Sequence, residues 1–283
     1  MITGSTGFIG SSLVATLLHQ NYKLLLLTRG RQPLATHDNL QYISSNLDAK
    51  QISEEMDSVD GVIHLATCFL SQHTSEDLPR LIDSNLLLGL KIAEAAKIAK
   101  VKWFINVGTF WQNCHSQTYK PANLYAATKE AFESILEYYK SSFTVVNLRL
   151  NDTYGPNDTR PKIFNLWKNL IAENSSLDMS PGEQIVDFTH IDDIVNAFST
   201  MVGLLAENSE KYQSKTYGIC SMNRLKLKEV ASIFEEVSKS KLKINWGKKP
   251  YRENEIMVPW TPEELVPNWK STITLKTGIQ SIL

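Results

Sequence analysis

The chain has 283 residues, of which 42% are hydrophobic and 21% are charged, and its formal net charge is −1. This length suits one large α/β domain with a smaller lobe, and the near-zero charge gives no long-range reason to expect nucleic acid as a partner. Three widely spaced cysteines without a C-x-x-C pattern argue against a disulfide framework or a zinc site. No apolar stretch approaches the roughly 20 residues that span a bilayer, so we expect no membrane partner and a cytoplasmic protein.

The first half of the chain alternates short apolar runs with amphipathic helical stretches. The expected strands cover residues 1–3, 23–28, 41–44, 61–66, 103–107 and 144–150. The expected helices cover residues 9–20, 78–100 and 126–141. Strands that are almost continuous in Val, Ile and Leu, and that alternate with helices, are typical of a parallel sheet covered on both faces. We therefore predict an α/β fold of the Rossmann type, with a doubly wound parallel sheet in residues 1–150.

The alternation weakens after about residue 150. Turn-forming residues crowd into 151–161 and 174–182, and helical stretches near 162–173, 191–205 and 227–240 dominate. We expect residues 151–283 to form a smaller C-terminal lobe, with some strand or helix returning to the first domain. The segment 246–269 is rich in Pro, Trp and charge, and is either a surface excursion or the wall of a binding cleft.

Gly4, Gly7 and Gly10 form a Gly-x-x-Gly-x-x-Gly turn between the first strand and the first helix. Glycines let the backbone turn tightly and approach a pyrophosphate closely, and the following helix directs free amides and its positive dipole end at the phosphates. The sequence therefore predicts a dinucleotide-binding turn. The residues expected to line it are Gly4, Thr6, Gly7, Phe8, Ile9 and Gly10.

Only Met1, Ile2 and Thr3 precede this turn, fewer than the roughly five residues of an average strand. Either the first strand is trimmed or the natural chain begins upstream of Met1. In both cases we expect weaker retention of the cofactor than in a relative with a longer first strand.

The second strand is expected to end at Thr28, and Arg29 and Arg31 follow it. Enzymes that prefer NAD usually carry an acid at this point, which bonds the ribose hydroxyls, and here there is none. A guanidinium would instead pair with the 2′-phosphate of NADP. We therefore expect NADP(H) as the cofactor, with Arg29 as the better candidate and Arg31 as the reserve. NAD(H) is the alternative, in which case Arg29 is a solvated surface residue.

Tyr125 and Lys129 stand one helical turn apart at the head of a predicted helix. A nearby ammonium and a positive nicotinamide ring both favour the phenolate, so we expect the pKa of Tyr125 to fall from about 10 toward the range of a general acid or base. Thr109 lies just past a strand, at the carboxyl edge where open α/β sheets bind ligands. Thr109, Tyr125 and Lys129 are thus the expected catalytic residues, and no metal site is expected.

Two further groups of polar residues have structural interpretations. We expect His64 and His190 to be packed or hydrogen-bonded within the fold. Asp192 and Asp193 precede an apolar helix, so they are more readily an N-terminal cap than a catalytic pair.

These motifs together resemble the extended short-chain dehydrogenase/reductases that modify nucleotide sugars. The resemblance rests on the glycine turn, residues 60–66, Thr109 and the Tyr125–Lys129 pair, and it continues through Tyr154-Gly155-Pro156, residues 182–193 and residues 251–256. Within this NAD-dependent epimerase/dehydratase family, the chain looks most like the branch of CDP-abequose and paratose synthases and related 4-keto-6-deoxysugar reductases. Residues 182–193 and 252–257 suggest that branch most.

The resemblance implies a role for each half of the chain and for each catalytic residue. Residues 1–150 would bind NAD(P), and residues 151–283 would bind the nucleotide sugar. Tyr125 would exchange a proton with the sugar C4 oxygen, Lys129 would hold the nicotinamide ribose, and Thr109 would complete the triad.

The resemblance also implies contacts outside the triad. Leu65 and Ala66 would lie against the cofactor. Asn85, together with Thr109, would contact the substrate, and Arg252 would grip its pyrophosphate. A homodimer formed through the two long helices of the first domain is implied as well.

The chain departs from the family pattern at three places. Val186 stands where many members place an arginine that binds the substrate pyrophosphate, and Asp152 stands where epimerases commonly have asparagine. Phe110 and Trp111 follow Thr109, where 4,6-dehydratases carry Asp-Glu as acid and base. Dehydration is therefore not expected.

The leading interpretation is an NADPH-dependent reductase of the C4 ketone of a nucleotide-linked 4-keto-6-deoxy or 3,6-dideoxy hexose. An NAD-dependent nucleotide-sugar 4-epimerase would use the same site. A non-catalytic dinucleotide sensor is a third alternative, although it would have no need of Tyr125. The resemblance implies a place in deoxysugar and O-antigen precursor synthesis for lipopolysaccharide, and no residue distinguishes CDP from dTDP, UDP or GDP as the carrier.

Overall fold

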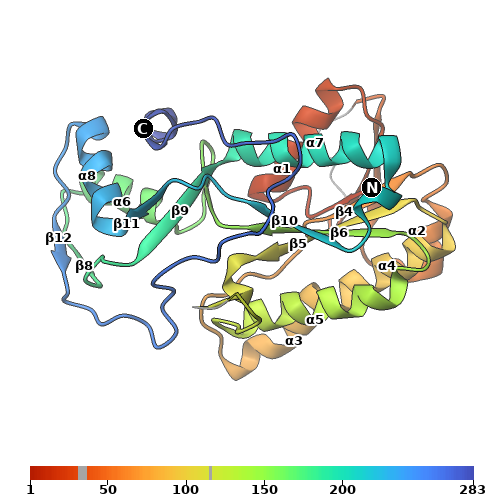
Figure 1. Cartoon of the computed structure of the whole chain (residues 1–283), viewed down its shortest axis with the longest axis horizontal. Helices are drawn as coiled ribbons and strands as arrows, with labels where there is room; N and C mark the ends of the chain where they lie inside the picture. Colours follow the sequence, from red (N-terminus) through yellow and green to blue (C-terminus); the bar gives the residue numbers. More distant parts are fainter. Residues whose placement is uncertain (31–36, 115–116) are drawn as a thin grey trace.

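The computed structural model describes residues 1–30, 37–114 and 117–283. The main sheet contains β1 (Ile2–Thr3), β2 (Leu24–Thr28), β3 (Leu40–Ser44), β4 (Gly61–His64), β5 (Trp103–Thr109), β6 (Thr144–Leu150) and β10 (Lys215–Ile219). In this part of the chain, these seven strands are all parallel and lie in the order β10-β6-β5-β4-β1-β2-β3 (Figure 1). The order reverses between β1 and β4, so the predicted doubly wound sheet of the Rossmann type is confirmed.

Helices cover both faces of this sheet (Figure 1). On one face, α1 (Phe8–His19) and α7 (Ile191–Asn208) bury their apolar stripes in a core that includes Leu13 and Phe198. On the other face, α2 (Ala49–Glu54), α4 (Leu88–Ile98) and α5 (Leu124–Tyr139) pack around Phe104 and Phe132. Every residue of β5 is buried, which explains why the strand is a nearly continuous apolar run.

The helix expected over residues 78–100 is divided into three parts. After a short 3-10 turn (Ser75–Asp77), α3 (Leu78–Ile82) leads into a π-helical turn (Asp83–Leu87) and then into α4. A π turn widens the helix by one residue, and such turns are frequent at functional sites. The buried residue of this turn is Asn85, whose contacts are described below.

The remaining elements form the smaller lobe. Three strands, β7 (Asp152–Tyr154), β9 (Ile185–His190) and β11 (Arg224–Lys226), make one sheet, and β8 (Leu177–Met179) pairs with β12 (Ile244–Trp246). The helices are α6 (Ile163–Ala172), α8 (Leu227–Ser238) and α9 (Leu275–Ile282). Their shared core is aromatic, because Phe164 and Phe234 stack at its centre and Trp167 meets both rings edge-on.

Parts of the C-terminal half return to the main sheet. Strand β10 pairs with β6 at the sheet edge, and α7 lies beside α1. The segment 246–269 buries Trp260 and Trp269, and Gly218 of β10 donates a backbone hydrogen bond of 2.9 Å to Glu264 in it. The division into residues 1–150 and 151–283 stays a prediction. No helix in the described ranges is long and apolar enough to cross a membrane.

Candidate active site

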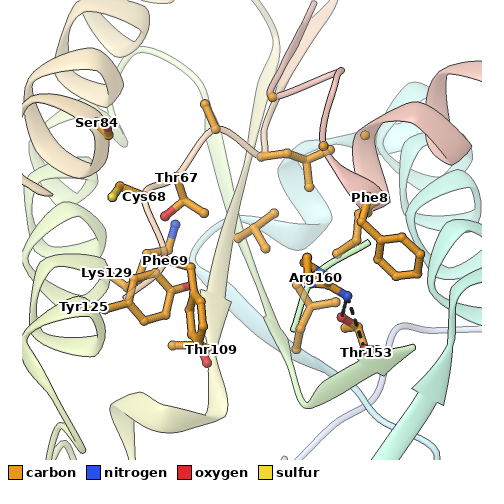
Figure 2. Close-up of a pocket in the computed structure, with 18 of the residues that line it drawn as sticks. Phe8, Thr67, Cys68, Phe69, Ser84, Thr109, Tyr125, Lys129, Thr153 and Arg160 are labelled. Atoms are coloured by element: carbon orange, nitrogen blue, oxygen red, sulfur yellow. Dashed lines mark hydrogen bonds between the residues drawn. The ribbon is translucent and has the colours of Figure 1, made fainter. Parts of the chain in front are cut away.

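A cavity of about 540 Å³ lies at the carboxyl edge of the main sheet (Figure 2). Ligands of open α/β sheets bind at this edge, beside the point where the strand order reverses. The structure brings most of the sequence-predicted site residues together here: Gly4, Thr6, Gly7, Phe8, Ile9, Gly10, Arg29, Leu65, Ala66, Thr109, Tyr125 and Lys129 all line the cavity. Arg31, the reserve candidate for the 2′-phosphate, lies outside the described residues.

The glycine turn leaves no room for a side chain at Gly4 or at Gly10. Gly4 has φ +70°, and a Cβ atom there would lie 2.6 Å from the backbone nitrogen of Ala66. A Cβ atom on Gly10 would lie 2.2 Å from the carbonyl oxygen of Gly4. The turn is closed by a hydrogen bond of 3.0 Å that the Gly7 N–H donates to the same oxygen. Glycine is therefore required by the close approach of turn, strand and helix.

Helix α1 begins at this turn and points its N-terminus at the cavity lining. Gly7 is its N-cap residue, and no side chain among the described residues caps it. The first amides of the helix and its positive dipole end are thus free for an anion. Phe8, Ile9 and Gly10 line the cavity next to them, so the residues present fit the pyrophosphate of a dinucleotide. The exposed Arg29 lines the cavity at the end of β2.

Thr109 is held from two sides at the end of β5. Its N–H donates a hydrogen bond of 2.8 Å to Oε1 of Gln112, and its Oγ1 accepts one of 3.3 Å from the N–H of Trp111. This local arrangement makes Thr109 the N-cap of the short 3-10 turn Phe110–Gln112. Figure 2 shows Thr109, Tyr125 and Lys129 gathered on one side of the cavity.

The first turn of α5 positions Tyr125. Asn123 caps the helix with its Oδ1, and its Nδ2 donates to the backbone oxygens of Leu70 at 3.2 Å and Ser71 at 3.1 Å. One asparagine therefore ties the loop after β4 to the start of α5. The ring of Phe69 in that loop meets the Tyr125 ring edge-on, with centroids 5.0 Å apart. Sequence reasoning missed Phe69, because its isolated position in a loop gives no signal.

Burial shifts the pKa values of Tyr125 and Lys129, the two expected catalytic residues on α5. It raises the pKa of Tyr125 to about 12, against the opposing effects of a hydrogen bond with Thr67 and of the Arg160 charge. It lowers the pKa of Lys129 to about 8, against the charge of Glu133. The expectation that the cation beside Tyr125 would lower its pKa is wrong for the protein by itself, because the cost of burying a phenolate is larger. Tyr125 is a neutral phenol here, which suits a proton donor.

Asn85 supports the loop beside the cavity and does not line it. Its Oδ1 accepts hydrogen bonds from the N–H of Cys68 at 2.6 Å and from Thr67 at 3.1 Å. Its Nδ2 donates to the carbonyl of Cys68 at 3.1 Å and to Thr128 at 2.9 Å. An asparagine side chain that is 2% exposed and has both donors and both acceptor sites in use has none left for a substrate. The predicted substrate contact is untested, and this geometry favours a supporting role.

Arg252 does not reach the cavity in this structure. It is exposed in the segment after β12, and its backbone N–H donates a long hydrogen bond of 3.4 Å to Glu255. Val186, at the position of the missing family arginine, packs against the aromatic core of the smaller lobe. The pyrophosphate contact predicted for Arg252 therefore stays a prediction that needs this segment to move.

Arg160 and Lys162 are among the cations that line the cavity and that sequence reasoning missed. The guanidinium of Arg160 stacks on the Phe8 ring at 4.4 Å, and the ammonium of Lys162 lies 4.7 Å from the centre of the Phe69 ring. Lys162 is also 4.0 Å from Asp152. Their only signal in the sequence was a position at the end of a turn-rich segment. A nearly neutral protein needs such local cations to bind an anionic ligand.

The cavity carries little acidic chemistry. Asp152 is the only acid among its described lining residues, and burial raises the pKa of that carboxyl, against the charge of Lys162. Phe110 and Trp111, the two residues after Thr109, line the cavity, and the lack of dehydration stays a prediction. Within the described residues, no group of three or more His, Cys, Asp or Glu side chains could hold a metal ion.

Comparison with known proteins relates the chain to nucleotide-sugar enzymes. Residues 1–219 match the NAD dependent epimerase/dehydratase family. The CDP-abequose synthase of Yersinia pseudotuberculosis is 29% identical over 92% of this chain and 90% of its own length. The CDP-abequose synthase of Salmonella typhimurium is 28% identical, over 100% of this chain and 96% of its own.

A solved structure shares the fold. UDP-glucuronic acid 4-epimerase from Bacillus cereus, in complex with UDP-glucuronic acid and NAD, superposes with a TM-score of 0.84 at 21% identity, over 99% of this chain and 96% of that one. The family match covers most of the chain, and the glycine turn fits a nicotinamide dinucleotide. The chain therefore belongs to the NAD dependent epimerase/dehydratase family and is an NAD(P)-dependent enzyme of the extended short-chain dehydrogenase/reductase type.

Proposed function

We propose that the chain is an NADPH-dependent reductase of the C4 ketone of a nucleotide-linked 4-keto-6-deoxy or 3,6-dideoxy hexose. The observation that carries this proposal is the neutral, buried phenol of Tyr125, placed in the cavity with Thr109 and Lys129. Reduction of a ketone needs a proton donor, and a phenol with a pKa of about 12 is protonated at every physiological pH. A 4-epimerase would use the same trio, and the similarity to CDP-abequose synthases is what favours reduction over epimerisation.

Each residue of the trio has a role in this reaction. Thr109 donates a hydrogen bond to the C4 oxygen and orients it. Tyr125 gives its phenolic proton to that oxygen, which becomes the hydroxyl of the product. Lys129 holds the nicotinamide ribose and stabilises the phenolate that forms, until a proton from water restores the phenol. Bound NADPH supplies the hydride that C4 receives.

The choice of NADPH over NADH rests on the end of β2. Arg29 lines the cavity there, and the sequence offers no acid at this point for the ribose hydroxyls. A guanidinium matches the geometry and charge of a 2′-phosphate. Arg160 and Lys162 are proposed to attract the diphosphate of the nucleotide sugar. They would do so in place of the arginine that many family members carry at the position of Val186.

The similarity to CDP-abequose synthases supports deoxysugar precursor synthesis as the setting, including that of O-antigen. We further propose a homodimer. Four large apolar side chains are exposed along α3 and its continuation: Leu78 at 42%, Ile82 at 46%, Leu87 at 45% and Leu90 at 39%. An apolar patch of this kind, repeated along one helical segment, is typical of a protein interface.

A substrate panel tests the reductase proposal against the 4-epimerase alternative, which the fold shared with a UDP-glucuronic acid 4-epimerase favours. The purified protein is mixed with NADPH and each of several CDP- or dTDP-linked 4-keto-6-deoxy hexoses, and NADPH absorbance is followed. We expect stoichiometric loss of absorbance and a C4 alcohol as product. Conversion of a nucleotide hexose into its C4 epimer without net cofactor change would establish the alternative. Binding of dinucleotide with no turnover of any sugar would indicate a sensor.

A further inference from the structure

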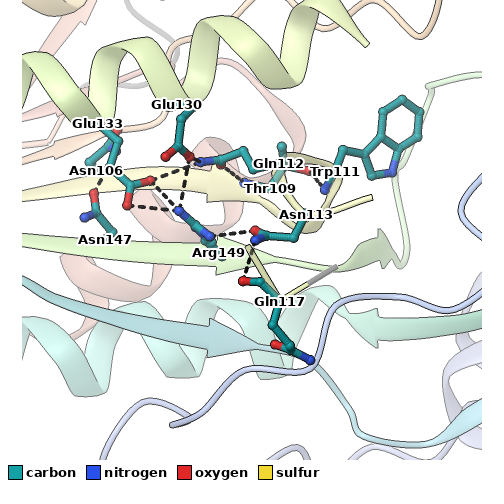
Figure 3. A network of polar contacts seen from close by, with 10 residues as sticks. All are labelled: Asn106, Thr109, Trp111, Gln112, Asn113, Gln117, Glu130, Glu133, Asn147 and Arg149. Carbon is teal, nitrogen blue, oxygen red and sulfur yellow. Dashed lines mark hydrogen bonds and ion pairs between the residues drawn. The ribbon is translucent and has the colours of Figure 1, made fainter. Parts of the chain in front are cut away.

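A polar network links the end of β5 to the middle of α5, behind the catalytic trio (Figure 3). We call it the Arg149 network, and its members are Gln112, Asn113, Glu130, Glu133 and Arg149. It joins the 3-10 turn after Thr109, strand β6 and helix α5. None of its members lines the cavity, so it acts on the site only through other residues.

Two carboxylates of the network share one guanidinium. Nη2 of Arg149 lies 3.1 Å from both carboxylate oxygens of Glu133 and 3.3 Å from Oε2 of Glu130. Nε2 of Gln112 donates to Glu130 at 2.6 Å and to Glu133 at 3.0 Å. The side chains of Arg149, Glu133 and Glu130 are only 12%, 14% and 25% exposed. These ion pairs are therefore largely withdrawn from water.

The charges within this network do not balance. Two carboxylates face one guanidinium, and an uncompensated charge in a water-poor site is costly. A second cation is present one helical turn before Glu133, because Lys129 lies at the i−4 position on α5. The charge of Glu133 raises the pKa of Lys129, in opposition to the burial that lowers it to about 8. Lys129 and Glu133 therefore stand one turn apart on the same helix, close enough for the carboxylate charge to act on the ammonium.

The other ionisable groups near Lys129 do not provide a free charge that would act on its ammonium in place of Glu133. His64 on β4 is neutral, because burial lowers its pKa to about 3. Tyr125 on α5 is neutral, because burial raises its pKa to about 12. Arg149 on β6 is engaged by the two carboxylates. Within the described residues, Glu133 is thus the charge that acts on Lys129.

The same network fixes the backbone of Thr109. Gln112 is fully buried, and its Oε1 accepts the hydrogen bond of 2.8 Å from the Thr109 N–H. Gly108 makes room for this contact, since a Cβ atom there would lie 2.6 Å from Oε1 of Gln112 and 3.0 Å from Cγ of Arg149. Gln112 therefore connects Thr109, through the shared carboxylates, to the helix that carries Tyr125 and Lys129.

We propose that Glu133 and Gln112 are positioning residues of this active site: Glu133 keeps Lys129 charged, and Gln112 fixes Thr109 relative to α5. The inference rests on the proposed function for the roles of Thr109 and Lys129. It predicts that loss of the Glu133 charge changes the pH dependence of the site, whereas loss of other bonds in the network does not.

Dinucleotide binding, measured by fluorescence titration with NADPH alone, tests the Glu133 part. Affinity is followed from about pH 6 to about pH 10, a range that brackets the Lys129 pKa of about 8. In the wild type, affinity falls as Lys129 loses its proton. In Glu133→Gln the midpoint of this fall moves to lower pH by about one unit, the shift that one nearby charge causes. Glu133→Asp, which keeps the charge, restores most of the midpoint.

Glu130→Gln is the matched control, because Glu130 bonds the same Gln112 and Arg149 atoms. Its midpoint is expected to stay at the wild-type value. An unchanged midpoint in Glu133→Gln, or an equal shift in Glu130→Gln, would overturn the role of Glu133. No sugar is present in this assay, so these results stand apart from the success or failure of the reductase panel.

The Gln112 part is tested by turnover. Gln112→Met keeps the volume and removes both hydrogen-bonding groups. We expect kcat to fall about tenfold or more because Thr109 loses its backbone anchor, with the pH midpoint and the KM for the sugar little changed. A wild-type kcat in a folded Gln112→Met protein would show that Thr109 needs no such anchor. A loss of kcat with a shifted pH midpoint would contradict the separation of the two roles.

Discussion

The guanidinium carbon of Arg160 lies 4.4 Å from the centre of the Phe8 ring. Phe8 is the first residue of α1, beside the glycine turn, and Arg160 follows β7 in the smaller lobe. Two hydrogen bonds of 2.7 Å to the carboxylate of Asp158 hold the guanidinium in this position. The pair therefore joins the glycine turn to the smaller lobe across the cavity.

Removal of the Phe8 ring is expected to weaken dinucleotide binding. Phe8→Leu keeps an apolar side chain but loses the aromatic face that holds the Arg160 guanidinium at the cavity. Because this contact exists before a ligand binds, only its ordering effect contributes, and we expect the NADPH dissociation constant to rise about 2-fold to 3-fold. Fluorescence titration measures the change. Phe8→Tyr keeps the ring face and is expected to bind as the wild type does. Equal affinities in all three proteins would mean that the contact plays no part in binding.

Loss of the Tyr125 hydroxyl is expected to remove the proton donor and little else. Tyr125→Phe should lower kcat for the keto sugar by about 10²-fold to 10⁴-fold, the usual contribution of general acid catalysis. The NADPH dissociation constant should stay within about 2-fold of the wild type, since the ring remains in place. Tyr138→Phe, at an exposed position on the same helix, serves as the control. Full turnover by Tyr125→Phe would refute the catalytic assignment.

His64 is expected to make the fold sensitive to acid. Its ring lies between Phe104 and Phe132, 2.9 Å from the Thr3 hydroxyl, and burial lowers its pKa to about 3. The unfolded chain binds a proton near the ordinary pKa of about 6.5, so stability is present above that pH and is lost as pH falls toward 3. The loss attributable to His64 at pH 5 is about 2 kcal/mol.

Urea denaturation at neutral pH and at about pH 5 measures this loss of unfolding free energy. His64→Asn is expected to be less stable at neutral pH but to lose less stability on acidification than the wild type. Replacement of the exposed His19 by asparagine should leave the wild-type pH dependence unchanged. A pH dependence that is the same with and without His64 would show that the buried imidazole is not the acid-sensitive group.

The sequence predicted those features that depend on local spacing. The glycine turn and the Tyr125–Lys129 pair are defined by residues three or four positions apart, and the sheet follows from apolar runs between helices. Strand β10 was not predicted, because only three of its five residues are buried and its place beside β6 depends on a contact with distant sequence. The π turn at Asn85 was not predicted either, because the apolar pattern of the helix continues through it.

Features of the site that depend on burial or on long-range contacts were not predictable in this way. Tyr125 has a raised pKa because the fold withdraws its phenol from water, which no spacing reveals. Arg160 and Lys162 reach the cavity because β7 lies across its edge. Arg252 shows the opposite case, because a motif typical of the family lies in a segment that this structure places outside the cavity.

The proposed preference for NADPH is expected to depend on Arg29. Its removal in Arg29→Ala should raise the NADPH dissociation constant about tenfold or more, the value of one hydrogen-bonded charge pair, and leave that of NADH nearly unchanged. Arg80 is the control, because it also lines the cavity but pairs with Asp77 at 2.9 Å. Arg80→Ala should affect both cofactors alike. If Arg29→Ala kept the wild-type preference, the 2′-phosphate contact would have to lie elsewhere.

A charge within the exposed apolar patch of Leu78, Ile82, Leu87 and Leu90 is expected to break the proposed homodimer. Leu90 is 39% exposed on α4, next to Leu87, and burial of both in a dimer would make Leu90→Glu place a carboxylate in an apolar interface. We expect Leu90→Glu to sediment as a monomer under conditions in which the wild type is a dimer. Leu166 on α6 has the same exposed fraction, 39%, but lies in the smaller lobe. Leu166→Glu should therefore remain a dimer, and dissociation by both substitutions alike would point to general destabilisation of the fold.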